Sequence, residues 1–158
     1  LASVGEKGFR TQMNITRCKP VCTCTDEFEN KIMPEIIANE TRYEAYGLED
    51  ADIVVTAYGT AARMAKAAIK ELDPNIKVGF IRPMTAWPFP DAPYRQIGPS
   101  CKAIFCPEIN TIGQMIDDVR IAVAGKCPVY HIGNTAQGPM NTETIIAALK
   151  AYFEGVKK

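Results

Sequence analysis

Apolar and polar positions along the chain fall into two repeating patterns. Short apolar runs at residues 52–58, 77–81, 102–106 and 128–132 predict four buried strands. Apolar residues at helical spacing after the first, third and fourth runs predict three helices. The three predicted apolar stripes comprise Ala61, Met64, Ala65, Ala68, Ile69 and Leu72, then Ile112, Met115, Ile116, Val119, Ala122 and Val123, and finally Ile145, Ile146, Leu149, Tyr152 and Phe153.

The order of these elements predicts the fold class. Strand, helix, strand, long loop, strand, helix, strand and helix follow one another, which is typical of an α/β fold with a mostly parallel sheet. Helices on both faces of the sheet make a three-layer sandwich. At the element ends we expect a tight turn at Gly59, N-caps at Thr60 and at Asn141 or Thr142, and a C-terminal stop at Gly125.

The first fifty residues predict a different organisation. Residues 26–46 carry apolar side chains at helical spacing, and Pro34 is expected to kink or split this helix. The apolar residues at that spacing are Phe28, Ile32, Ile36 and Ile37. We therefore predict an irregular N-terminal segment at 1–25, a helical linker arm at 26–50 and the α/β domain at 51–158.

Charge and composition narrow the class of protein. Eighteen basic residues balance eighteen acidic ones without a basic cluster, which argues against a dedicated nucleic-acid binder. No apolar run of the sequence is long enough to span a bilayer, so no membrane partner is expected. The long helix and strand patterns favour a cytoplasmic protein whose six cysteines are free thiols. Because the chain begins at Leu1 without a methionine, we expect a piece cut from a longer polypeptide.

Three of the cysteines cluster near the N-terminus. Cys18, Cys22 and Cys24 have a spacing that matches neither a zinc knuckle nor the usual ferredoxin run. No fourth ligand stands nearby, and Pro20 intervenes. We interpret these cysteines as unligated thiols and keep a thiol–metal module as the alternative.

The segment "IRPMTAWPFP" at residues 81–90 is unusual for a loop that leaves a strand. Its three prolines fix φ and remove three N–H donors, so the loop is stiff without a hydrogen-bonded ladder. We expect this frame to hold Trp87 and Phe89 outward, where preorganised aromatic rings lose little entropy on docking to another domain or subunit. The alternative is that Trp87 folds back over the edge of its own sheet.

The segment "PEINTIGQM" at residues 107–115 follows the third predicted strand, where open α/β sheets place their ligands. Glu108, Asn110 and Gln114 bring three polar side chains into one connection. In one interpretation Gln114 reaches across an interface and Glu108 accepts hydrogen bonds from loop N–H groups. In the other, Asn110 or Thr111 caps the helix and Glu108 ties down the turn.

Two further residues carry possible chemistry. Gly59 stands at a strand-to-helix turn, but the dinucleotide fingerprint requires two more glycines that are missing. A small-molecule binding module, with nucleotide phosphates at Gly59 and Thr60, is therefore the alternative function. His131 is the only histidine and lacks a nucleophile motif, which favours a packed, neutral side chain.

Several of these segments together resemble a known family. The stretches "ADIVVTAYGTAARMAKAAIKEL", "KVGFIRPMTAWPFP", "PEINTIGQMIDDVRIAVAG" and "PVYHIG" resemble the C-terminal part of the alpha subunit of 2-oxoacid:ferredoxin oxidoreductases. The 2-ketoisovalerate and 2-oxoglutarate types are the most similar, over roughly residues 26–150. Ala86 departs from the family pattern, which has a bulky aliphatic residue before Trp87.

The resemblance implies a transketolase C-terminal-like fold, whose last strand can run antiparallel. It implies CoA-dependent oxidative decarboxylation of a 2-oxoacid, with electrons passed to ferredoxin through thiamine diphosphate and iron–sulfur clusters. The thiamine diphosphate, its magnesium and the clusters belong to other domains or subunits, namely a thiamine-binding beta, a gamma and a ferredoxin-like subunit. We therefore expect no catalytic, cofactor-binding or metal-ligating residue in this domain.

The resemblance also transfers residues by position. Those expected to form interfaces or organise loops are Arg82, Pro83, Trp87, Pro88, Phe89, Glu108, Asn110, Gly113, Gln114, Met115 and Arg120, accompanied in the family pattern by Gly59 and Asp118. Arg120 is expected to pair with an acid across the contact or, locally, with Asp117 or Asp118. The leading interpretation is a non-catalytic assembly domain that is inactive when isolated.

Overall fold

A computed structural model describes residues 25–134 and 138–155 of the chain. Contacts between residues divide the chain into two units, one ending at Asn39 and the other beginning at Glu40. Within the described ranges, no helix combines the length and the apolar character needed to cross a membrane. The cluster predicted at Cys18, Cys22 and Cys24 lies outside the described residues.

The first unit contains the predicted helix. A π-helical turn, η1 (Phe28–Ile32), leads directly into α2 (Met33–Glu40), and the N–H of Met33 donates to the carbonyl of Phe28. Pro34 is the second residue of α2, but no non-helical residue separates α2 from η1, and the hydrogen bonding changes from π- to α-helical just before this proline. The predicted split at Pro34 is therefore wrong, and the predicted kink stays a prediction.

The helix does not continue to residue 46, and this part of the prediction is wrong. Tyr43–Tyr46 form strand β1, which pairs antiparallel with β3 (Val78–Pro83). Tyr46 packs its ring on Phe80, with centroids 5.4 Å apart, and Ala45 packs into the core. Pairing with an open edge of β3 therefore outweighs the local helical pattern, as expected for aromatic residues on a half-buried surface. The boundary predicted at residue 51 remains an expectation.

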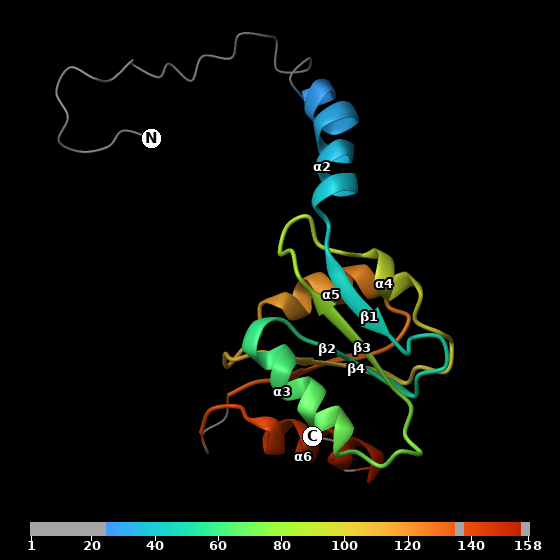
Figure 1. The fold of residues 1–158 in the computed structure, drawn as a ribbon, viewed down its shortest axis with the longest axis vertical. Coiled ribbons are helices and arrows are strands. Elements are labelled where there is room, and N and C mark those ends of the chain that lie inside the picture. Colours follow the sequence, from blue (N-terminus) through green and yellow to red (C-terminus); the bar gives the residue numbers. More distant parts are fainter. Residues whose placement is uncertain (1–24, 135–137, 156–158) are drawn as a thin grey trace, which may run out of the picture. The chain divides into compact units, whose positions relative to one another are not determined.

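The second unit is built on a five-stranded sheet in the order β1-β3-β2-β4-β5 (Figure 1). Strands β2 (Ile53–Thr56), β4 (Ala103–Pro107) and β5 (Val129–Ile132) run parallel to one another and to β3. The mostly parallel α/β sheet is confirmed. The antiparallel strand is β1 at the start, not the last strand as the resemblance implied, since β5 pairs in parallel with β4.

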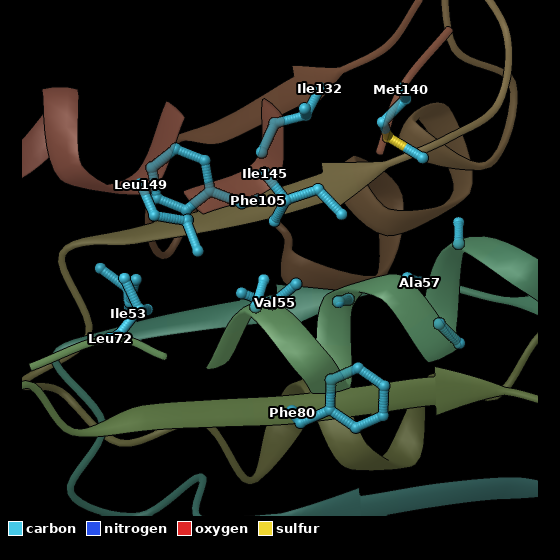
Figure 2. Packing of buried hydrophobic residues seen from close by; sticks show 14 of the residues in the cluster. Ile53, Val55, Ala57, Leu72, Phe80, Phe105, Ile132, Met140, Ile145 and Leu149 are labelled. Carbon is cyan, nitrogen blue, oxygen red and sulfur yellow. The ribbon is translucent and has the colours of Figure 1, made fainter. Parts of the chain in front are cut away.

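Helices cover both faces of this sheet, which makes the predicted three layers (Figure 1). Helices α3 (Gly59–Lys70) and α6 (Thr142–Phe153) share one apolar cluster with side chains of the strands, part of which Figure 2 shows. Helices α4 (Ala92–Arg95) and α5 (Met115–Val123) share a second cluster on the other face. Because β2 and β4 are buried along their whole length, they lie between the two clusters.

The ends of the helices test the finer predictions. Gly59, at φ +55°, makes the predicted turn, but it is already the first residue of α3, so the N-cap position is Tyr58 and not Thr60. Asn141 caps α6 as predicted, accepting a hydrogen bond from the N–H of Thr144 at 2.8 Å. Ile112 is not part of the helical stripe, because α5 begins only at Met115 and leaves Ile112 83 % exposed.

Candidate functional site

A buried carboxylate organises the connection between β4 and α5. Glu108, directly after β4, has no solvent exposure. Its two oxygens accept hydrogen bonds from the N–H groups of Gln114, Met115 and Ile116, at 2.9 to 3.1 Å. These are N–H groups that the first turn of α5 leaves without an intrahelical partner. Glu108 therefore satisfies the free N–H groups at the start of α5, although it is not itself part of that helix.

The hydrogen bonds decide the charge state of Glu108. Burial by itself acts to raise the pKa of this carboxyl, since a charge loses its hydration there. The N–H groups of Gln114, Met115 and Ile116 and the side-chain amide of Asn110 oppose burial, and the net pKa is lowered. Glu108 is consequently an ionised carboxylate held by the backbone. Both of its oxygens accept hydrogen bonds from the protein itself, so its role is structural.

The turn between Glu108 and α5 depends on Asn110 and Gly113. The Asn110 amide donates to Glu108 at 3.2 Å, and its side-chain oxygen accepts from the N–H of Gly113. Gly113 has φ +79°, and a Cβ there would lie 2.8 Å from Ile116 and 3.0 Å from His131. A glycine is needed at this position on both counts.

The structure bears on both interpretations of the segment at residues 107–115. Glu108 does tie down the turn, as one of them expected. The N-cap residue of α5 is Gln114, which makes no side-chain capping bond, so the prediction that Asn110 or Thr111 caps the helix is wrong. Gln114 is exposed, and its side chain is free to reach outward. Arg120 pairs locally with Asp117 at 3.1 Å.

The proline-rich loop is fixed to the sheet by one threonine. The Thr85 hydroxyl accepts a hydrogen bond from the N–H of Arg42 at 3.1 Å and lies 3.1 Å from the carbonyl of Pro88, to which it donates. The carbonyl of Arg42 accepts from the N–H of Met84 at 3.0 Å. The loop is therefore attached to the segment that leads into β1.

The two aromatic residues of this loop point in different directions. Trp87 is 59 % exposed. Phe89 is half-buried and stacks on Tyr94 of α4, with ring centroids 5.6 Å apart, and the Tyr94 hydroxyl is 2.7 Å from the Thr56 hydroxyl. The prediction that both rings are held outward is wrong for Phe89, because Tyr94, on a short helix that the sequence pattern did not predict, offers it an apolar partner.

Arg82 is held in place at the end of β3 by an acidic neighbour. Glu44 of β1, the residue opposite Arg82 in the register, lies 3.7 Å from its guanidinium and 2.6 Å from the ammonium of Lys66. The hydrogen bond from Lys66 is the main cause that lowers the pKa of Glu44. The charge of Arg82 is thus partly compensated within the domain.

A pocket of about 520 Å³ lies where these segments meet. It is lined by Tyr58, Gly59, Arg82, Pro83, Met84, Thr85, Ala86, Phe89, Gln114, Met115 and Asp118. These residues lie at or just after the carboxyl ends of β2 and β3, or at the start of α5. Since β2 leads to a helix on one face and β4 to a helix on the other, this is the switch point of the sheet, the usual place for ligands or partners in such folds.

Exposed apolar residues collect in the connections at this edge. We use "carboxyl-edge surface" for the exposed residues Tyr58, Met84, Trp87, Ile109 and Ile112, all of which follow the carboxyl ends of parallel strands. Sequence reasoning predicted Trp87 as an interface residue but did not identify Tyr58 and Met84, which line the pocket. Tyr58 ends the strand predicted at 52–58 and Met84 closely follows the strand predicted at 77–81, and this position near strand ends was the signal that could have found them.

Other candidate chemistry has little support. The described parts of the chain bring together no group of three or more His, Cys, Asp or Glu side chains able to hold a metal. His131 is half-buried in β5, and its Nε2 is buried without a hydrogen-bond partner within the residues that the structure describes.

The fold is a mostly parallel α/β domain with a pocket and exposed apolar residues at the switch point of its sheet. The family model of the pyruvate:ferredoxin oxidoreductase core domain II matches residues 51–145, and the chain belongs to this family.

Sequence relatives agree with this assignment. Ketoisovalerate oxidoreductase subunit VorB of Methanothermobacter marburgensis is 41 % identical over 85 residues, which are 53 % of this chain and 24 % of that protein. 2-Oxoglutarate synthase subunit KorA of the same organism is 33 % identical over 82 residues, 51 % of this chain and 22 % of that protein. The matches thus span about a quarter of the length of these relatives.

Solved structures share the fold. A 2-oxoglutarate:ferredoxin oxidoreductase from Magnetococcus marinus, determined with 2-oxoglutarate, coenzyme A and succinyl-CoA bound, aligns with a TM-score of 0.67 at 23 % identity, over 85 % of this chain and 24 % of that one. A split-gene transketolase in the form of an inactive "beta4" tetramer aligns with a TM-score of 0.57 at 16 % identity, over 69 % of this chain and 40 % of that one. At these identities the likeness concerns the fold alone.

Proposed function

We propose that this chain is the C-terminal assembly domain of the alpha subunit of a cytoplasmic, multi-subunit 2-oxoacid:ferredoxin oxidoreductase. The whole enzyme carries out CoA-dependent oxidative decarboxylation of a 2-oxoacid and passes the electrons to ferredoxin. The VorB and KorA relatives, whose names state ketoisovalerate and 2-oxoglutarate chemistry, support the substrate class. Thiamine diphosphate, magnesium and the iron–sulfur clusters belong to the other subunits.

The exposed indole of Trp87 is the observation that carries this proposal. Its loop is braced by three prolines and by the bonds of Thr85, so the ring is presented without further ordering of the backbone. Tryptophan in a desolvated contact is among the strongest contributors to binding free energy. Met84 and Tyr58 are also exposed and line the pocket, which provides a recess for a partner side chain.

The polar residues of the site support an organising role rather than a reacting one. Glu108 is saturated by backbone N–H groups, the charge of Arg82 is partly compensated by Glu44, and Arg120 is paired with Asp117. Their interactions fix the shape of the β4–α5 connection and of the loop after β3. In the proposed enzyme this shape positions the exposed Gln114 and Trp87 against the neighbouring subunit, while Met115 is buried in the domain's own apolar cluster.

A reconstitution experiment tests this proposal. The isolated chain is expected to reduce no electron acceptor with 2-oxoacid and CoA, whereas co-expression with the remaining polypeptides of the oxidoreductase yields a complex that contains the chain and reduces ferredoxin. Turnover by the isolated chain, or an active complex that excludes it, contradicts the proposal.

The pocket favours a second candidate, a free-standing binding module for a small molecule. Its volume of about 520 Å³ falls within the range of small-molecule sites, and Gly59 at the start of α3 lines it. Calorimetry of the isolated chain with nucleotides and CoA separates the two candidates. Tight binding that is lost when Gly59 is replaced by a bulky residue supports the second one.

A further inference from the structure

Two cysteines meet at the edge of the sheet opposite to the carboxyl-edge surface. Cys101 precedes β4 and Cys127 precedes β5, so both lie at the amino ends of neighbouring parallel strands. The register pairs Ile104 with Val129, and the N–H of Ile104 donates to the carbonyl of Pro128 at 2.9 Å. This pairing brings the residues just ahead of the two strands side by side.

The side chains of the two cysteines share one environment. Cys101 is buried in the apolar cluster beneath α5, and Cys127 is half-buried and packs against the same cluster. Each thiol is close enough to the other to contribute to the shift of its pKa. The Cys101 thiol also donates to the carbonyl of Ala103 at 3.4 Å, which directs it along the amino end of β4. Both are free cysteines in the structure.

We propose that Cys101 and Cys127 form a reversible disulfide when the protein meets a peroxide. The bond would join the loop before β4 to the loop before β5. The second of these loops is also held to the end of α4, because the ammonium of Lys126 donates to the carbonyl of Arg95 at 3.2 Å. The proposal is independent of the proposed function, because the pair lies away from the pocket and the carboxyl-edge surface.

The reaction balances with hydrogen peroxide as the oxidant. The thiolate of the more exposed Cys127 attacks one peroxide oxygen, the O–O bond breaks, and the departing hydroxide takes up a proton to become water. The thiolate of Cys101 then attacks the sulfur of the Cys127 sulfenic acid and forms the S–S bond. The hydroxyl group of the sulfenic acid leaves and takes up a proton to become a second water. Two thiols are oxidised by two electrons, and one peroxide is reduced to two waters.

The environment of the thiols sets the expected rate. Burial, followed by the nearby Cys101, raises the pKa of Cys127 to about 12, although Lys126 opposes this. Little thiolate therefore exists at neutral pH, and the thiolate is the nucleophile. We expect slow oxidation at neutral pH and faster oxidation as the pH is raised.

Peptide mapping of the full chain tests the disulfide. After treatment with hydrogen peroxide, alkylation of the remaining thiols and digestion, we expect a linked peptide pair that contains Cys101 and Cys127 and disappears on reduction with dithiothreitol. It should be absent from the Cys101→Ser and Cys127→Ser variants and present in Cys106→Ser, which changes a buried thiol elsewhere. The oxidised protein should melt roughly 5 to 10 °C higher than the reduced one, because the bond constrains the unfolded chain.

Three results would overturn the proposal. The first is that Cys101 and Cys127 are recovered as alkylated thiols while other cysteines oxidise. The second is a disulfide from Cys127 to Cys18, Cys22 or Cys24, and the third is accumulation of Cys127 as sulfinic acid without a disulfide. If Cys101→Ser fails to fold, Cys127→Ser, at the more exposed position, still decides the outcome.

Discussion

At the scale of single residues, Glu108 shows how far sequence reasoning reaches. Its place after a strand indicated a carboxylate among loop N–H groups, and the structure confirms that role. The sequence did not reveal that the donors are the first N–H groups of α5, because the start of that helix was placed too early, near Ile112. Gly113, whose φ of +79° allows the turn, explains why the helix starts later.

Replacement of Glu108 by glutamine removes the negative charge of a carboxylate that accepts hydrogen bonds from several backbone N–H groups. Because hydrogen bonds to charged groups are strong and their donors are left poorly satisfied, we expect Glu108→Gln to lower the free energy of unfolding by about 2 to 4 kcal/mol at neutral pH. Urea unfolding measures this loss. Glu71→Gln, which changes an exposed carboxylate, should leave the free energy nearly unchanged.

The lowered pKa of Glu108 gives this prediction a pH dependence. A carboxyl whose pKa is lower in the folded state stabilises the protein above its ordinary value of 4.5, and this contribution is lost as the pH falls through the folded-state pKa. The difference between wild type and Glu108→Gln should therefore shrink in acid. A difference that stays constant from neutral pH into acid contradicts the assignment of an ionised Glu108.

At the scale of elements, the sequence predicted the buried strands and the long helices and missed the elements that depend on neighbours. Strands β2 and β4 are buried on both faces, so their continuous apolar runs identify them. Strand β1 has only four residues and follows a helical pattern, and it exists because the edge of β3 offers it backbone partners. Helix α4, also four residues long, depends on Tyr94 packing into the core.

The cap of α6 is an element whose contribution can be measured directly. Asn141 accepts from the N–H of Thr144 at 2.8 Å and from its hydroxyl at 2.8 Å. We expect Asn141→Ala to lower the free energy of unfolding by about 1 kcal/mol, as for other lost N-caps. Asn141→Asp should restore most of this stability in the same denaturation experiment, and an aspartate no better than alanine would rule out a capping role.

At the scale of the whole molecule, the carboxyl-edge surface is the feature on which the proposed assembly role depends. Sequence reasoning identified the stiff loop and its tryptophan, since prolines and aromatic residues are visible in the sequence. It did not separate Trp87 from Phe89, because the direction of each ring depends on Tyr94 and on the attachment of Thr85 to Arg42. The result is one exposed indole beside a pocket, with its loop fixed to the sheet.

Association of the Trp87→Ala chain with the other subunits of the proposed oxidoreductase tests the proposed assembly role most directly. Wild type, Trp87→Ala and Ile121→Ala are compared by affinity of association. Ile121 is 75 % exposed on α5 and lies outside the carboxyl-edge surface, which makes it a matched control. Loss of Trp87 should weaken association by at least tenfold while the melting temperature of the isolated chain stays nearly unchanged, and Ile121→Ala should behave as wild type. Equal association of wild type and Trp87→Ala, or an equal loss in both variants, would contradict docking through this surface.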